Sequence, residues 1–276
     1  MLPTRYLQTT NKETLTLPKS ALIAFLTLST AMTAPAFAQE APAAPAASTP
    51  AATTPTDPAA PAEAAPAATA MTPEQIVAFN TAVTDFTAGQ SAQQSGDNAT
   101  AVTKYEAAIP AIKTAVESDP SKMDNVNFLA NALYANAAAY GAMGQLDKTI
   151  ALYGESLPYW RKLVEAKPTD AASRNILAGI LIQMGNQKLG AQDKAGSAPL
   201  YSEALTLARK SVAENATDNI NKNILLSALI GASQSTSDTA LQTEAVEMSK
   251  KMLADGSVDA TNKPSAQALT GAPQAG

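Results

Sequence analysis

The chain has 276 residues with a formal net charge of −5, and it contains neither cysteine nor histidine. Without cysteine it has no disulfides or thiolate metal sites, and without histidine it lacks the usual general base and the commonest transition-metal ligand. An acidic balance also argues against nucleic acid or anionic lipid as a partner, because both require a basic surface. We therefore expect no cofactor, no metal and no catalytic residue.

The first 38 residues are typical of a secretory signal peptide. Three basic residues precede the apolar run 21–32, and Ala36-Phe37-Ala38 has the small-x-small pattern of a cleavage site. The apolar run is shorter than the roughly 20 residues that span a bilayer. Cleavage after Ala38 removes three basic side chains and one acidic one, which changes the net charge from −5 to −7. We expect a bacterial periplasmic or secreted protein with no integral membrane segment in its mature form.

Residues 39–71 consist mainly of alanine, proline and threonine. Such a composition cannot bury enough apolar surface to offset the entropy of ordering, and its prolines favour extended polyproline II. We expect a disordered linker here. A tether and a passive leader are both compatible with this composition. At the other end, residues 256–276 are polar and small, which predicts a second disordered tail.

Between residues 72 and 255 the sequence predicts helices. Thr72-Pro73-Glu74-Gln75 is a helix start, with a hydroxyl cap, a proline at the first helical position and an acid in the first turn. Alanine- and leucine-rich segments follow, and short polar stretches separate them. These stretches lie at 95–98, 119–121, 144–145, 167–170, 190–196, 215–218 and 233–238. Their spacing predicts repeated helix-turn-helix units.

The predicted units repeat every 48 residues. Asn127 returns as Asn175 and Asn223, each followed by two apolar residues. The second helix of each unit carries an apolar stripe with steps of four, three and four, which places its members on one helix face. The stripes are Tyr105, Ile109, Ile112 and Val116; Tyr153, Leu157, Trp160 and Val164; and Tyr201, Leu205, Ala208 and Val212. Because Trp160 belongs to a stripe, we expect it in the core rather than in a ligand site.

This pattern resembles the tetratricopeptide repeat family. Residues 143–150 are similar to the mid-repeat turn of that family, and Tyr153, Ser156, Leu157 and Lys167-Pro168 follow at matching positions. Gly89, Ala137 and Gly185 correspond to its close-packing small residue. The resemblance implies an all-α solenoid of antiparallel helix-turn-helix repeats, with three good units and a degenerate fourth over residues 72–255.

The units differ from that family in length, because its usual unit has about 34 residues. Pro110 and Pro158 occupy equivalent positions inside the long second helix. Each removes a backbone donor, which predicts a kink or a split at that point. The apolar stripe continues past both prolines, so a kink is the favoured interpretation.

The resemblance also implies a protein-binding scaffold whose first helices line a concave groove. The candidate groove residues are Phe86, Gln90, Gln93, Asn131, Tyr134, Ala138, Ile182 and Asn186. Amide side chains both donate and accept hydrogen bonds, which suits an extended peptide backbone, and the aromatic residues offer apolar anchors. The alternative is that several of these residues only make helix–helix contacts.

Two other repeated positions each allow two interpretations. Asn127, Asn175 and Asn223 either touch a ligand or, as the favoured interpretation, hydrogen-bond the preceding turn. The recurring basic residues Lys113, Arg161 and Arg209 are expected on solvated faces or paired with acids four residues later. Those acids include Glu117 and Glu165.

The sequence therefore predicts a non-enzymatic scaffold of the cell envelope that binds a protein or peptide. An alternative is a glycan- or small-molecule-binding envelope protein, or a hydrolase that uses carboxylates such as Glu106, Glu155 and Glu203. A third interpretation is that the repeats mainly drive self-association.

Overall fold

The structure, a computed structural model, describes residues 68–271. The predicted signal peptide and residues 39–67 of the predicted linker lie outside this range, as do residues 272–276. Within the described residues the chain forms helices and no strands. The helices are α1 (Pro73–Gln94), α2 (Asn98–Ser118), α3 (Met123–Ala142), α4 (Leu146–Ala166), α5 (Ala171–Gly190), α6 (Lys194–Glu214), α7 (Asn219–Ser235), α8 (Thr239–Asp255) and α9 (Lys263–Thr270).

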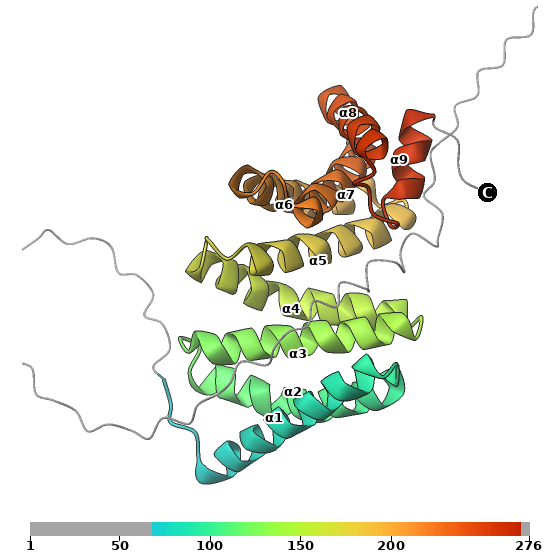
Figure 1. The fold of residues 1–276 in the computed structure, drawn as a ribbon. Helices are drawn as coiled ribbons and strands as arrows, with labels where there is room; N and C mark the ends of the chain where they lie inside the picture. Colours follow the sequence, from blue (N-terminus) through green and yellow to red (C-terminus); the bar gives the residue numbers. More distant parts are fainter. Residues whose placement is uncertain (1–67, 272–276) are drawn as a thin grey trace, which may run out of the picture.

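These helices form a stack in which each one packs against the next (Figure 1). The pairs α1/α2, α3/α4, α5/α6 and α7/α8 are the four units, and α2, α4 and α6 begin 48 residues apart. We call α1, α3, α5 and α7 the first helices and α2, α4, α6 and α8 the second helices. The expected all-α solenoid of helix-turn-helix repeats is confirmed.

Local sequence signals fix where the helices begin. At α1, the hydroxyl of Thr72 accepts from the Gln75 amide N–H, and the Gln75 side chain accepts from the Thr72 N–H at 2.8 Å. Pro73 occupies the first helical position, as predicted. In the first three units, the turn between the two helices contains one left-handed residue. These residues are Gly96, Gly144 and Gln192, with φ of +84°, +74° and +63°.

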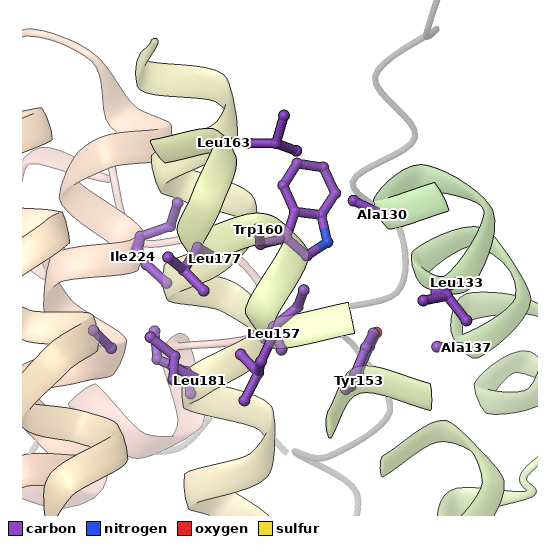
Figure 2. Close-up of a cluster of buried hydrophobic side chains, with 14 of the residues drawn as sticks. Ala130, Leu133, Ala137, Tyr153, Leu157, Trp160, Leu163, Leu177, Leu181 and Ile224 are labelled. Atoms are coloured by element: carbon purple, nitrogen blue, oxygen red, sulfur yellow. The ribbon is translucent and has the colours of Figure 1, made fainter. Parts of the chain in front are cut away.

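The core lies between first and second helices and is built from the predicted stripes. Tyr153, Leu157 and Trp160 of α4 are at most 7 % exposed. Figure 2 shows them between Ala130, Leu133 and Ala137 of α3 on one side and Leu177, Leu181 and Ile224 on the other. Trp160 is 1 % exposed, so its placement in the core is confirmed. A side chain of this size contributes roughly 1.5–3 kcal/mol when buried, and neighbouring units supply the cover.

The repeated tyrosine sets how closely the helices approach. A Cβ atom at Gly89 would lie 2.7 Å from the Tyr105 ring. A Cβ atom at Gly185 would lie 2.9 Å from the Tyr201 ring, and one at Gly231 would lie 2.0 Å from it. Tyr201 is fully buried, and it connects the third unit to the fourth through this contact. The close-packing role expected for Gly89 and Gly185 is therefore confirmed.

The prolines do not split their helices. Pro110 lies inside α2 and Pro158 inside α4, and both helices are continuous through these positions. Both prolines are exposed, so the backbone groups that they leave without a partner can reach solvent. A kink at either proline stays a prediction.

The predicted disordered tail from residue 256 is wrong for the residues that the structure describes. Gly256 ends α8 in a left-handed conformation with φ of +74°, and α9 follows with Pro264 in its first turn. Val258 and Leu269 pack against a buried cluster to which α7, α8 and Ala266 of α9 contribute. The composition of this segment suggested a tail because only a few of its side chains anchor it, and they form no periodic pattern in the sequence.

The tyrosine contact predicts opposite effects for two Gly→Ala substitutions in first helices. Gly231→Ala should lower the free energy of unfolding by about 1–3 kcal/mol, because the new methyl group overpacks against Tyr201. Gly179→Ala is the matched control, since a Cβ atom there meets no heavy atom within 4 Å. It should raise stability by up to about 1 kcal/mol through helix propensity. Urea unfolding followed by circular dichroism measures both, and equal effects would contradict the described packing.

Candidate functional site: the first-helix face

First and second helices differ in charge. Residues 125–142 of α3 and 175–187 of α5 contain no charged side chain. The second helices carry most of the ion pairs, and α1 contributes only Asp85, which lies 2.9 Å from Lys104 of α2. Any ligand that contacts the middle of α3 and α5 therefore meets uncharged groups.

Two of the predicted groove residues have aromatic contacts inside the stack. The Phe86 ring lies 5.5 Å from the Tyr105 ring and 5.1 Å from the Phe128 ring. The Tyr134 ring stacks on Tyr153 at 5.9 Å and meets Trp160 edge-on at 6.2 Å. Burial raises the pKa of the Tyr134 phenol. Both residues are packed against the main core, so they support the helices more than they offer a surface.

Three others also serve the interior. The Gln93 side chain accepts the Tyr105 hydroxyl at 2.8 Å, and the Asn186 side chain accepts the Tyr201 hydroxyl at 2.6 Å. Burial raises the pKa of both tyrosines, which keeps their hydroxyls available as donors. Ile182 is 1 % exposed, so its expected place in a groove lining is wrong.

The partly exposed positions of the first helices form a smaller surface, which we call the first-helix face. It consists of Gln90, Asn127, Asn131, Ala138, Asn175 and Gly179. The Asn131 amide nitrogen donates to the Asn127 backbone carbonyl at 2.8 Å and to its side-chain oxygen at 3.0 Å. The side-chain oxygen of Asn131 is buried and has no partner, so it belongs to the interior of the stack. Beside Gly179 there is open space, so another backbone can approach α5 closely there.

The repeated asparagines do not bond the preceding turn, so the favoured interpretation is wrong. That role belongs to residues two positions earlier. The Asn125 amide donates to the Ala115 carbonyl at 3.3 Å, and the Asn221 amide donates to the Ser211 carbonyl at 3.0 Å. Asn175 instead donates to the Asn221 side chain at 2.7 Å, which connects α5 to α7. Sequence reasoning missed Asn125 and Asn221 because serine takes the equivalent position in the third unit.

The basic residues pair across units, not four residues along their own helix. Nε and Nη2 of Arg161 donate to the Glu203 carboxylate of the next second helix, at 2.8 and 2.7 Å. Lys113 pairs with Glu155, and Arg209 pairs with Glu244, in the same direction along the stack. The expected partners Glu117 and Glu165 make none of the ion pairs found here. The 48-residue repeat relates the first two pairs, whereas Arg209 finds its acid at a position outside the repeat.

The carboxylates considered for hydrolysis are engaged separately. Glu155 and Glu203 belong to the ion pairs just described, and Glu106 accepts a hydrogen bond from the Tyr140 hydroxyl of α3. No two of them share a partner. Within residues 68–271, no group of three acidic side chains is placed to hold a metal ion.

A buried arginine is a further feature that the sequence did not single out. The Arg174 side chain is fully buried and contacts the Pro168 carbonyl, the Glu214 carboxylate and the Ser211 hydroxyl. These partners engage all three side-chain nitrogens, so Arg174 joins α5 to the end of α6 and is not free to hold a ligand.

Comparison of the chain with models of protein families, with characterised proteins and with solved structures gives no match. The structure establishes a helical repeat protein. None of the helices in residues 68–271 has the length and hydropathy needed to cross a bilayer.

The pairing across units predicts a measurable coupling between Arg161 and Glu203. A double-mutant cycle with Arg161→Ala and Glu203→Ala should give about 0.2–1 kcal/mol, reduced by salt, because the pair is exposed. The control cycle replaces Glu203→Ala with Glu165→Ala and should give no coupling. Coupling of Arg161 to Glu165 and not to Glu203 would contradict the pairing across units and would show that Arg161 pairs within its own helix.

Proposed function

We propose that this protein is a non-enzymatic scaffold of the bacterial cell envelope that binds an extended polypeptide along the first-helix face. The observation that carries the proposal is the chemistry of that face. It offers amides and small residues on α3 and α5 without a charged side chain. Ligands that depend on charge, such as nucleotides or terminal carboxylates, find no counterpart there.

An extended peptide has the complementary chemistry. Its backbone presents donors and acceptors in alternation, and each asparagine amide can serve one of each. Gly179 leaves room for a close backbone, and Asn175, one turn earlier on α5, is partly exposed. Asn223, which repeats Asn127 and Asn175, already holds backbone groups of the chain's own C-terminal segment. This contact supports a peptide as the ligand class.

The finer assignments belong to the same proposal. The motif from residue 143 to Pro168 supports membership of the tetratricopeptide repeat family, and the signal-like residues 1–38 support the envelope location. The ion pairs of Glu155 and Glu203 support a scaffold over a carboxylate hydrolase, because each acid is matched by a base. Tethering by residues 39–71 would let the scaffold reach a partner at a distance.

Gly179 and Ala151 give the sharpest test, because both are accessible but lie on different kinds of helix. Gly179 is on α5 in the first-helix face, and Ala151 is exposed on α4. A photo-crosslinking amino acid at position 179 should capture a polypeptide in intact cells, and the same probe at position 151 should not.

Blocking variants provide the second arm of this test. Gly179→Arg should lower the capture by probes elsewhere on the face, such as at position 90, by about tenfold or more, since it fills the open space with a charge. Ala151→Arg adds the same charge and should leave capture unchanged. Equal capture from both positions, or none from position 179, would contradict the proposed face.

A further inference from the structure

The connection between α8 and α9 departs from the repeat. The connections from one unit to the next, such as residues 167–170 and 215–218, have four residues, whereas residues 256–262 make seven. These residues and α9 lie beside α7 and α8 at the end of the stack (Figure 1). The longer connection allows part of the chain to run across α7 before α9 begins.

Asn223 holds this segment by its backbone. The Asn223 amide nitrogen donates to the Ser257 carbonyl at 2.8 Å, and its side-chain oxygen accepts from the Asp259 N–H at 2.9 Å. One side chain thus makes a donor and an acceptor contact on the two sides of Val258. Contacts of this kind recognise an extended backbone independently of its sequence.

Two side chains of the segment add specificity. Val258 packs against the buried cluster of Leu226, Ile230 and Met252, which Ala266 of α9 completes. Four residues later, the Asn262 side chain accepts from the Ser227 hydroxyl at 2.6 Å and donates to the Asn223 carbonyl at 3.0 Å. The segment therefore presents one apolar residue and one amide to fixed partners on α7 and α8.

The exposure of α7 also distinguishes it from the other first helices. Asn127 of α3 and Asn175 of α5 are partly exposed, whereas Asn223 is 6 % exposed. The residues 257–262 cover the position that stays open in the earlier units. A terminal segment that only covers the apolar end of the stack would not require hydrogen bonds from Asn223 to its backbone.

We infer that Asn223, Leu226, Ser227, Ile230 and Met252 form a peptide-recognition site that the chain's own residues 257–262 occupy. We call these five residues the C-terminal site. Its ligand is a peptide that is extended around an apolar residue and then turns, so that an amide side chain follows four residues later, as residues 257–262 do. A partner peptide of this kind competes with the resident segment. The ligand class rests on the proposed function, whereas the occupied site rests on the contacts above.

The test uses the full-length chain and a labelled synthetic peptide of residues 256–271. Val258→Asp in the protein places a charge in the apolar cluster and should release the resident segment. By fluorescence anisotropy, this variant should bind the peptide at least about tenfold more tightly than the wild-type protein. A labelled peptide that carries Val258→Asp should not bind.

Asn223 and Asn80, both on first helices, supply matched variants. Asn223→Ala added to Val258→Asp should weaken peptide binding by about tenfold or more, because two backbone contacts are lost. Asn80→Ala in the same background should leave binding unchanged, because Asn80 is exposed on α1 and lies outside both proposed binding surfaces. The inference is overturned if the released protein, folded by circular dichroism, binds no better than wild type, or if both asparagine changes act equally.

Hydrogen exchange on the wild-type protein keeps the inference testable if Val258→Asp does not fold. The Asp259 amide should exchange at least about tenfold faster than the buried amides of α7, because the segment opens while the stack persists. If the Asp259 amide and the buried α7 amides exchange at the same rate, the segment opens only when the stack unfolds, and the inference is contradicted. Neither readout depends on capture at position 179, so this inference and the proposed function can fail separately.

Discussion

The contact between a tyrosine of the second helix and a small residue of the first helix is the constraint on which the rest depends. Tyr201 lies between Gly185 and Gly231, where an added Cβ atom would come within 3 Å of its ring. Such contacts fix the helix spacing within a unit and, through Gly231, between units. Interiors are close-packed, so one methyl group at this place cannot be accommodated without a shift.

This close packing determines what the first helices can offer to a partner. The hydroxyls of Tyr105 and Tyr201 donate to Gln93 and Asn186. Phe86 and Tyr134 pack against buried tyrosine rings. The residues left accessible are short amides and glycine, which suit backbone recognition. The exposed ion pairs between second helices add little stability, as such pairs generally do.

The repeat period and the stripes were readable from the sequence because buried positions such as Tyr105 and Trp160 recur with helical spacing. Partners across units were not readable. The periodic pattern predicts on which side of its helix Arg161 lies. Whether it pairs with Glu165 or Glu203 depends on how the units pack against each other. The same holds for Ile182, whose burial comes from neighbouring helices and not from its own.

The C-terminal segment shows a different limit of sequence patterns. Residues 257–262 have the composition of a tail, and their order comes from the Asn223 side chain and the position of Val258. Specific hydrogen bonds of this kind leave no period in a sequence. The candidate site was therefore only partly predictable: the repeated asparagines were identified, whereas their partners required the structure.

The most direct measurement of the central contact is nuclear magnetic resonance on the folded protein. The account places the Tyr201 ring against the backbone of Gly231. It therefore predicts strong nuclear Overhauser effects between the Tyr201 ring protons and the Gly231 α-protons, together with large ring-current shifts of those α-protons. Unshifted Gly231 resonances without a cross-peak to Tyr201 would contradict the packing from which both proposed binding surfaces follow.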